Sequence, residues 1–258
     1  MYDEEQLRVD ILKTSHRIWK NGWVANHDGN LTVKLADQRL LATPTAVSKG
    51  DVQPEWLIVV DHEDNVVQGT RRAFSELKLH RAAYAARPDI GCVIHAHPPT
   101  VTGFAVAGVD IGHPFLAEAI VSLGKTIPTI PFMLPNDPQL PGAIASALAN
   151  ADVVVLANHG ALSVGGSLEQ AYLRMELLEH LAKIALVSQQ LGGHRPLPKD
   201  VVDKLSQRSR PQSMPDHRPA SSLVQSSSPL GHRSLPNASG RPDVESLVAD
   251  ALNKLKKC

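Results

Sequence analysis

The 258-residue chain lacks an excess of charge of either sign, long apolar runs and a set of cysteines. Lysine plus arginine and aspartate plus glutamate both number 26, so we expect no basic patch for nucleic acid or an anionic membrane. No run approaches the ~20 apolar residues of a transmembrane helix, and the first residues, MYDEEQLRVD, are acidic where a signal peptide is basic. Two cysteines, Cys92 and Cys258, make no disulfide framework. We therefore expect a cytoplasmic protein without nucleic-acid or membrane partners.

Residues 1–205 alternate helical and strand patterns, which predicts an α/β domain with a central sheet. The segment from His113 to Pro141 is expected to be an irregular loop, because it contains Pro128, Pro131, Pro135, Pro138 and Pro141. The expected helices cover residues 7–19, 75–86, 143–150 and 167–190. The expected strands cover residues 30–35, 39–43, 56–61, 91–96 and 153–156.

The composition changes near residue 206. Serine and proline dominate residues 206–240, which show no periodic signal and predict a disordered linker. Residues 241–258 predict a helix, because an apolar stripe recurs there at helical spacing: Val244, Leu247, Val248, Ala251, Leu252 and Leu255. A lone helix of this length is marginal in water and needs a partner surface. It can fold back on its own domain, dock onto another protein or lie on a membrane; the long linker favours another protein, and the lack of aromatics disfavours a membrane.

Three histidines are candidates for a metal site. His95 and His97 lie two apart in an expected strand and so point to the same face, and His159 follows the apolar run 153–156. Three neutral imidazoles leave one position of a tetrahedral zinc ion free for a substrate, which is typical of catalytic sites. An isolated His-x-His pair also occurs in ordinary strands, so the surrounding residues decide. Cys92 lies three residues from His95, faces the other way and is expected in the core.

Glu76 and two polar turns supply further candidate groups. Glu76 opens an expected helix, where a carboxylate can act as a general base or as a displaced metal ligand. A glutamate in a first turn can also simply stabilise the helix dipole. The turns Asp28-Gly29-Asn30 and Thr43-Pro44-Thr45-Ala46 carry backbone N–H groups and hydroxyls that can cradle an anion, or they are plain turns.

Six motifs that occur in order resemble those of the class II aldolase/adducin family, over about residues 5–195. They are Gly29-Asn30, Thr43-Pro44-Thr45, Ser75-Glu76, Arg87-Pro88-Asp89, Val93-Ile94-His95-Ala96-His97 and Asn158-His159-Gly160. The resemblance implies a three-layer α/β/α fold with a central, mainly antiparallel sheet, and a homotetramer with active sites at its interfaces. It implies one Zn²⁺ ion per subunit on His95, His97 and His159, with Glu76 as the catalytic acid/base. It also implies a sugar-phosphate substrate, whose phosphate would be bound by Gly29, Asn30, Thr45, Ala46 and Ser75.

The chain departs from the pattern of the sugar-phosphate aldolases at three places. Phe74 stands where a serine is usual, and Ala46 stands where a glycine is usual; nearby Lys49 can compensate with its charge. The segment His113-Pro114-Phe115 has no tyrosine to act as proton donor, which leaves His113 and Glu118 as candidates.

The tail resembles an encapsulation peptide, a short helix after a linker that tethers an enzyme to a shell protein of a bacterial microcompartment. Together the resemblances favour cleavage of L-fuculose or L-rhamnulose 1-phosphate into dihydroxyacetone phosphate and L-lactaldehyde, a volatile aldehyde that gives a reason for confinement in the microcompartment lumen. The metal would stabilise the enediolate and Glu76 would move the proton next to the carbonyl. A pentulose-phosphate 4-epimerase, a dehydratase of methylthio-sugar phosphates and an aldolase for a non-phosphorylated compound also fit these residues. A non-enzymatic scaffold, as in the adducin head domains, is disfavoured because those domains lack the zinc histidines.

Overall fold

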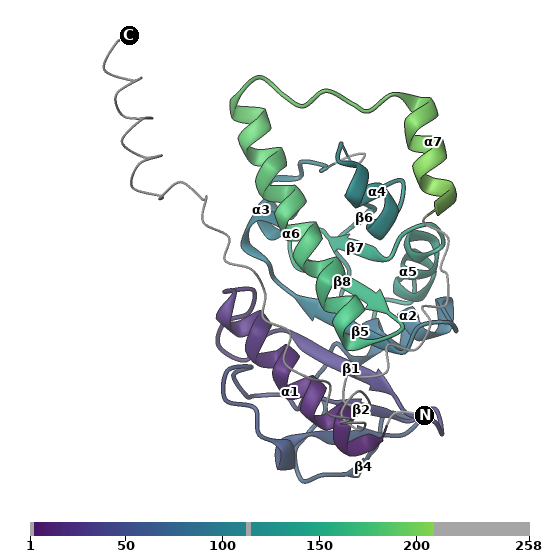
Figure 1. The fold of residues 1–258 in the computed structure, drawn as a ribbon. Coiled ribbons are helices and arrows are strands. Elements are labelled where there is room, and N and C mark those ends of the chain that lie inside the picture. The colour runs from purple at the N-terminus through teal and green to yellow at the C-terminus, as the bar shows by residue number, and fades with distance from the viewer. Residues whose placement is uncertain (1–2, 112–114, 209–258) are drawn as a thin grey trace, which may run out of the picture. The chain divides into compact units, whose positions relative to one another are not determined.

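The computed structural model describes residues 3–111 and 115–208, and Figure 1 gives their arrangement. Within these residues the chain forms a sheet of eight strands in the order β4-β3-β2-β1-β5-β8-β7-β6. Neighbouring strands are antiparallel, except that β6 is parallel to β7. The strands are β1 (Asn30–Lys34), β2 (Leu40–Ala42), β3 (Ile58–Val60), β4 (Val66–Gln68), β5 (Cys92–Ala96), β6 (Thr129–Ile130), β7 (Val153–Leu156) and β8 (Gly160–Gly165).

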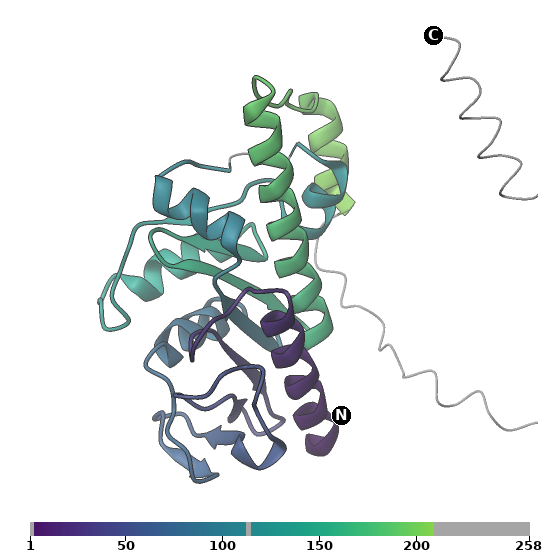
Figure 2. The same cartoon turned by 90° about the vertical axis from the view of Figure 1, so that its left-hand side faces the viewer.

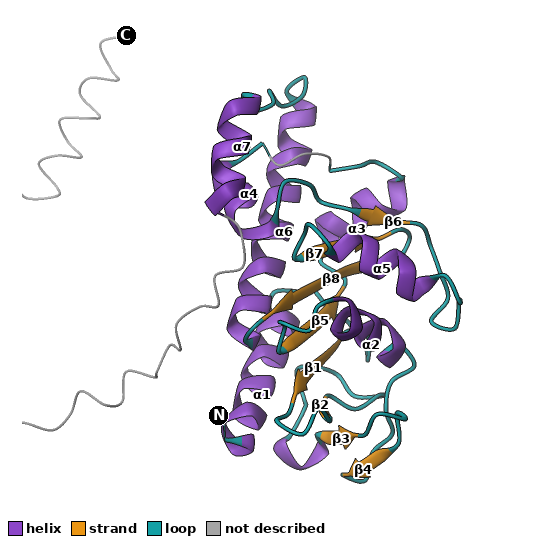
Figure 3. Ribbon diagram, turned by 90° about the vertical axis from the view of Figure 1, so that its right-hand side faces the viewer, coloured by secondary structure: helices purple, strands orange, loops and turns teal. Residues whose placement is uncertain are grey.

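Helices cover both faces of this sheet. In the described part of the chain they are α1 (Glu4–Lys20), α2 (Leu77–Ala86), α3 (Pro99–Ala107), α4 (Ala117–Leu123), α5 (Leu140–Leu148), α6 (Leu168–Gln190) and α7 (Lys199–Arg208). The apolar side chains of α1, α3, α4 and α6 share one core, and those of α2 and α5 share another. Figure 2 shows α1 and α6 along the same side of the sheet, and Figure 3 shows α2 and α5 on the other side. The expected three-layer, mainly antiparallel fold is confirmed.

Strand β5 lies in the sheet between the two apolar cores, and it positions His95 and, two residues later, His97. It lies between β1 and β8, and its side chains alternate between the two faces as the pleat requires. Cys92 and Ile94 point into the core of α1 and α6, whereas Val93 points into the core of α2 and α5. Cys92 is a buried free cysteine, so its expected place in the core is confirmed. The same alternation turns His95 toward α2.

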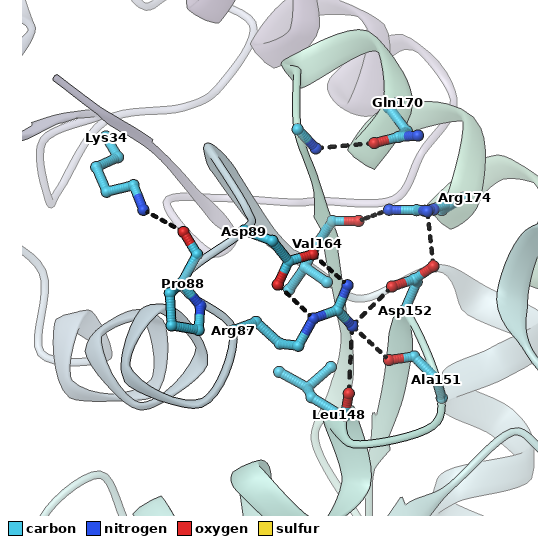
Figure 4. Close-up of polar contacts among 11 residues, drawn as sticks. Lys34, Arg87, Pro88, Asp89, Leu148, Ala151, Asp152, Val164, Gln170 and Arg174 are labelled. Atoms are coloured by element: carbon cyan, nitrogen blue, oxygen red, sulfur yellow. Dashed lines mark hydrogen bonds and ion pairs between the residues drawn. The ribbon is translucent and has the colours of Figure 1, made fainter. Parts of the chain in front are cut away.

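A network of partly buried charges joins the end of α2 to the β7–β8 hairpin (Figure 4). Arg87 binds Asp89 at 2.8 Å and Asp152 at 2.9 Å, and it donates to the carbonyl of Leu148 at 3.2 Å. Arg174 of α6 binds Asp152 from the other side at 2.6 Å. The motif Arg87-Pro88-Asp89 therefore fixes the packing of α2, β7 and α6, away from the histidines.

The strongly periodic helices and strands lie close to where the sequence predicts them. In α1, the side chain of Asp3 accepts from the backbone N–H of Glu5 at the N-cap, and in α6 Ser167 accepts from that of Gln170. The strand expected at 56–61 is shorter, because Pro54–Trp56 forms a 3-10 turn and only Ile58–Val60 pairs.

The prediction of an irregular loop between His113 and Pro141 is wrong for the part of this segment that the structure describes. Residues Ala117–Leu123 form α4, Thr129–Ile130 form β6, and α5 begins at Leu140. The prolines are compatible with these elements because they lie between them or, like Pro141, in the first turn of a helix, where no N–H is needed. The chain is also helical through Arg208, so the first three residues of the expected linker, 206–208, belong to α7.

Residues 209–240, the predicted tail helix 241–258 and His113 lie outside the described residues. Within the described ranges, none of the helices combines the length and the apolar character needed to cross a membrane.

Candidate metal centre and active site

The three predicted histidines converge at one end of the sheet. His95 lies at the end of β5 and is fully buried, His97 follows two residues later, and His159 lies in the turn between β7 and β8. One ring nitrogen from each residue lies within 4.8 Å of the others. His95 Nε2 and His97 Nε2 are 3.0 Å apart. The structure therefore brings together the metal ligands expected from the sequence.

The hydrogen bonds of His95 and His97 fit a metal ion. His95 Nδ1 lies 3.0 Å from the carbonyl oxygen of Ala161, and His97 Nδ1 lies 2.8 Å from Asp28 Oδ2. Both acceptors need a proton on Nδ1, so in the neutral rings each Nε2 carries a lone pair, and the two lone pairs face each other. A cation between them relieves this repulsion, and a tetrahedral zinc ion at about 2.0–2.1 Å from each nitrogen would hold them roughly 3.3 Å apart.

Electrostatics keep these rings in the form that binds metal. Burial lowers the pKa of His95 to about 3 and also lowers the pKa of His97, although Glu76 and Asp28 act in the opposite direction. A neutral imidazole is the metal-binding form.

The turn that carries His159 depends on two backbone features. Asn158 has a φ of 55°, in the left-handed region that asparagine tolerates better than most residues. At Gly160, a Cβ atom would lie 2.5 Å from Cδ2 of His97 and 2.6 Å from the carbonyl oxygen of Ala96. Glycine is required there so that β8 can pass directly against the ring of His97.

Glu76 points at the histidines instead of capping its helix. It precedes α2, and its carboxylate makes no capping hydrogen bond. Its Oε1 lies 2.7 Å from His159 Nε2 and 3.5 Å from His95 Nε2. Burial alone would raise the pKa of Glu76, but the contact with His159 and the hydrogen bond from Asn30 outweigh it and lower the pKa well below its usual range. The ionised carboxylate can accept a proton or bind the ion.

The predicted phosphate cradle is partly assembled around Glu76. Asn30 is buried, and its Nδ2 donates to Glu76 Oε2 at 2.7 Å. Ser75 is exposed beside Glu76. The backbone N–H of Thr45 donates to the carbonyl of Arg72 at 3.1 Å, which holds the Thr43–Ala46 turn against the segment that leads to Ser75. Anion binding by these groups stays a prediction.

Gly29 and Ala46 provide tight backbone in the two turns of this cradle. Gly29 has a φ of 69°, and a Cβ atom there would lie 2.3 Å from Cγ1 of Val24. Ala46 is exposed with a φ of 58°, so it adopts the backbone for which glycine is the usual residue. Ala46 therefore holds the left-handed turn conformation although it carries a Cβ atom.

Lys49 lies beneath the two turns. Its side chain is only 1% exposed, and its Nζ donates to the carbonyls of Val47 at 3.0 Å and His27 at 3.3 Å. Burial lowers its pKa to about 8, against the attraction of Asp28 and Glu76. The ammonium group thus ties the two turns together, and its predicted contribution of charge to the cradle would act through space.

Two other sequence expectations are located by the structure. Phe74 is buried in a third apolar cluster, where its ring packs edge-on against His80 at 5.2 Å, so it does not simply replace a phosphate-binding hydroxyl at the surface. Glu118 is exposed in the first turn of α4, whose apolar side chains pack in the core of α6, on the opposite face of the sheet from α2. Within this protomer's described residues, Glu118 is not brought to the histidines.

An apolar pocket opens beside Glu76 and His159. Its remaining lining is aliphatic, aromatic or sulfur-containing: Leu79, Ile130, Pro131, Phe132, Met133, Pro135, Leu140, Leu156 and Ala157. No lysine or arginine lines this pocket among the described residues. This pocket was not predicted from the sequence, because five of the lining residues lie between positions 130 and 135, in the segment that was expected to be an irregular loop.

Asp28 and His80 are also functional candidates that sequence reasoning missed. Asp28 was expected only as part of a turn, and nothing in its spacing predicts a contact with His97. His80 does carry a signal, because Glu76 and His80 are four residues apart at the start of one helix and therefore share a face.

Comparison with known proteins agrees with this fold. The profile of the family described as Class II Aldolase and Adducin N-terminal domain matches residues 9–186. A 3-oxo-tetronate 4-phosphate decarboxylase of Escherichia coli (strain K12) is 29% identical over 198 residues, 75% of this chain and 91% of that protein. An L-fuculose phosphate aldolase of Methanococcus vannielii is 29% identical over 175 residues, 68% of this chain and 93% of that protein.

A solved structure of an L-fuculose 1-phosphate aldolase has the same fold, with a TM-score of 0.72 at 24% identity over 81% of this chain and 97% of that chain. The chain belongs to the class II aldolase/adducin family. The two relatives named above are a decarboxylase and an aldolase. Class II aldolases generally depend on a divalent metal ion.

Proposed function

We propose that the protein is a zinc-dependent aldehyde-lyase that cleaves a 6-deoxy-ketose 1-phosphate, L-fuculose or L-rhamnulose 1-phosphate, into dihydroxyacetone phosphate and L-lactaldehyde. The observation that carries the proposal is the apolar pocket directly beside Glu76 and His159. The three histidines would hold the ion, and the turns around Asn30, Thr45 and Ser75 would bind the phosphate.

The proposed chemistry needs one proton to be removed and one to be delivered. Zinc, when bound, would supply Lewis-acid stabilisation of the charge on the substrate's carbonyl oxygen. Glu76, which starts as a carboxylate, takes the proton of the C4 hydroxyl as the C3–C4 bond breaks, and the electron pair passes to the triose phosphate fragment as an enediolate. Glu76 then delivers a proton to C3, which completes dihydroxyacetone phosphate and balances the proton taken from the hydroxyl.

The pocket supports a substrate whose far end is a methyl group. Burying one methyl group contributes about 0.8 kcal/mol. A hydroxymethyl group at the same place would bury a hydroxyl without a partner, at a cost of about 1–3 kcal/mol. L-Fuculose 1-phosphate should therefore exceed its 6-hydroxy analogue, L-tagatose 1-phosphate, by a factor of roughly 5 to 150 in kcat/KM.

A second candidate is decarboxylation of a 3-oxo sugar acid phosphate. The identity of 29% to a protein named 3-oxo-tetronate 4-phosphate decarboxylase favours it. Loss of carbon dioxide next to a carbonyl also leaves an enediolate, which the same carboxylate can protonate. The lack of a cationic side chain among the described residues of the pocket gives a substrate carboxylate no partner there.

The test is a coupled assay for dihydroxyacetone phosphate with both deoxyketose phosphates, on zinc-loaded and chelator-treated protein. Zinc-dependent release that is lost in Glu76→Gln and retained in the exposed Glu55→Gln control is expected. Carbon dioxide release from 3-oxo-tetronate 4-phosphate without triose phosphate from either ketose would replace the aldolase by the decarboxylase. Interconversion of pentulose phosphates would indicate an epimerase, loss of water from a methylthio-sugar phosphate a dehydratase, and cleavage of a non-phosphorylated compound an aldolase of different specificity. A scaffold would catalyse none of these reactions.

We also propose that the protein forms a homotetramer and that residues 241–258 bind a shell protein of a bacterial microcompartment. Phe132 and Leu134, which are 58% and 64% exposed near the pocket, support a subunit interface at this place. The apolar stripe in the sequence of the tail supports the shell interaction.

A further inference from the structure

We infer that His80 is a positioning residue that holds Glu76 through the side-chain amide of Asn30. This inference rests on the proposed function in one respect, because it takes Glu76 as the group that moves the proton. His80 lies on α2 and is fully buried. Its Nε2 lies 2.6 Å from Asn30 Oδ1, and Asn30 Nδ2 donates to Glu76 Oε2 at 2.7 Å. The amide of Asn30, at the start of β1, thus connects Glu76, which precedes α2, to His80 on α2.

The chain of contacts fixes where each proton lies. The ionised Glu76 carboxylate has no proton to give, so the Asn30 atom that faces it must be the Nδ2 donor. Asn30 Oδ1 is then turned to His80, and because it only accepts, His80 Nε2 must carry the hydrogen. Burial lowers the pKa of His80 to about 3, so the ring is neutral and its Nδ1 is an acceptor.

The other side of His80 is held by β1 and by α2 itself. Thr32 Oγ1 lies 2.8 Å from His80 Nδ1 and so donates to it. The hydroxyl of Tyr84 lies 3.0 Å from Thr32 Oγ1 and donates to the carbonyl of Thr32 at 3.0 Å. The edge-on ring of Phe74 packs against His80. Phe74, the residue that departs from the usual serine, therefore contributes to the wall that locks the imidazole.

These hydrogen bonds determine the orientation of the Asn30 side-chain amide. An asparagine side chain is nearly symmetric in shape, and rotation by half a turn would place Oδ1 against the Glu76 carboxylate and repel it. The N–H group at His80 Nε2 can form a hydrogen bond with Asn30 only when Oδ1 faces it, so it selects one of the two orientations. We therefore assign to His80 the selection of the Asn30 orientation that steadies Glu76 for proton transfer.

The first test needs no substrate and no metal. Protein labelled with ¹⁵N in its histidine rings is observed by long-range ¹H–¹⁵N NMR, with the His80 signal identified by its absence in His80→Gln. The expected result is a neutral Nε2–H tautomer between about pH 5 and 8. A neutral Nδ1–H tautomer, or a protonated ring, would overturn the inference whether or not the enzyme cleaves any sugar phosphate.

The second test separates positioning from folding. His80→Leu removes both hydrogen bonds, and kcat should fall about 10- to 100-fold while KM and bound metal change little. His80→Gln can donate and accept along the same line and should restore most of kcat. The exposed His16→Leu substitution is the matched control and should leave kcat unchanged.

The decisive test is the double substitution of His80→Leu together with Asn30→Ala. If His80 acts through Asn30, His80→Leu should cause no further fall in kcat once Asn30→Ala is present. Independent, multiplying losses would overturn the inference, as would a His80→Gln variant as impaired as His80→Leu. If His80→Leu fails to fold, His80→Gln and the tautomer measurement still decide. Inactivity of the unaltered enzyme on every substrate would overturn the proposed function and leave the tautomer result to judge the positioning.

Discussion

Replacement of Glu179 by glutamine should destabilise the protein strongly, although Glu179 lies on α6 and touches none of the histidines. Its side chain is 1% exposed and accepts hydrogen bonds at the start of α3. Oε1 accepts from Thr100 Oγ1 at 2.8 Å, and Oε2 accepts from the backbone N–H groups of Thr100 at 3.1 Å and Val101 at 3.0 Å. The N-cap residue of α3 is Pro98, which has no side chain able to do this.

The magnitude follows from these contacts. Hydrogen bonds to a charged group each contribute about 1.5–3 kcal/mol. In Glu179→Gln one oxygen remains as an acceptor, but the new NH₂ group faces backbone donors, and the charge that favours the helix N-terminus is lost. We expect a loss of about 2–4 kcal/mol in the free energy of unfolding, a large part of the total of about 5–15 kcal/mol that is usual for a domain.

Urea unfolding at pH 7 of the wild type and Glu179→Gln measures this loss. The control is Glu118→Gln, on an exposed position of α4, which should stay within about 0.5 kcal/mol of the wild type. Because α3 begins two residues after His97, Glu179→Gln should also weaken zinc binding, whereas the control should not. A Glu179→Gln protein within about 0.5 kcal/mol of the wild type would refute the capping argument.

Three further predictions concern the metal centre, the charge network and the tail. Asp28→Asn should lower zinc affinity by about 10- to 100-fold in a chelator competition, because Asp28 orients the ring of His97 at 2.8 Å; unchanged affinity would contradict this. The hydrogen bonds from Arg87 lower the pKa of Asp89, so the stability from this pair is complete above an unfolded pKa of about 4 and is lost as the pH falls through the folded value. Arg87→Leu should lower the free energy of unfolding by about 1–3 kcal/mol at pH 7, mostly through the lost contacts with Asp152 and the carbonyl of Leu148, because solvent screens the half-exposed Asp89. The loss should be smaller at pH 3, measured by urea unfolding; an equal loss at both would count against the ion pair. A chain that ends at residue 208 should keep its specific activity but no longer co-purify with shell proteins when they are expressed together, and retained co-purification would locate the shell contact elsewhere.

The parts of the fold that the sequence predicts are those whose own pattern determines them. The apolar period and the N-cap of Ser167 mark α6, and the branched run Val153–Leu156 marks β7. Strand β8 could not be predicted, because Gly160–Gly165 is rich in small residues and becomes a strand through its pairing with β5 and β7 on both sides. Helix α4 could not be predicted for a related reason. The nearby prolines indicated a loop, whereas the helix is stabilised by tertiary burial of Ile120 and Leu123.

The candidate site divides in the same way. His95, His97 and His159 could be predicted because strand alternation and the end of a buried strand place them without further knowledge of the fold. Asp28 and Glu179 could not, because each acts on a segment that is 69 or 79 residues away along the chain. Their partners depend on how β1, α3 and α6 pack, and sequence spacing carries no information on that packing.

The histidines and Glu76 cannot by themselves distinguish an aldolase from a decarboxylase. In both reactions a bond next to a carbonyl breaks and a proton is then delivered to the same enediolate carbon, so both need the same ion and the same carboxylate. What differs is the departing fragment, an aldehyde in one case and carbon dioxide from a charged carboxylate in the other. Selection between them must therefore come from the wall that faces this fragment. In the proposed function that wall is the apolar surface of Ile130, Phe132 and Met133, which carries no charge. A buried carboxylate without a partner is far more costly than a buried methyl group, and this difference is the physical reason for preferring the deoxyketose.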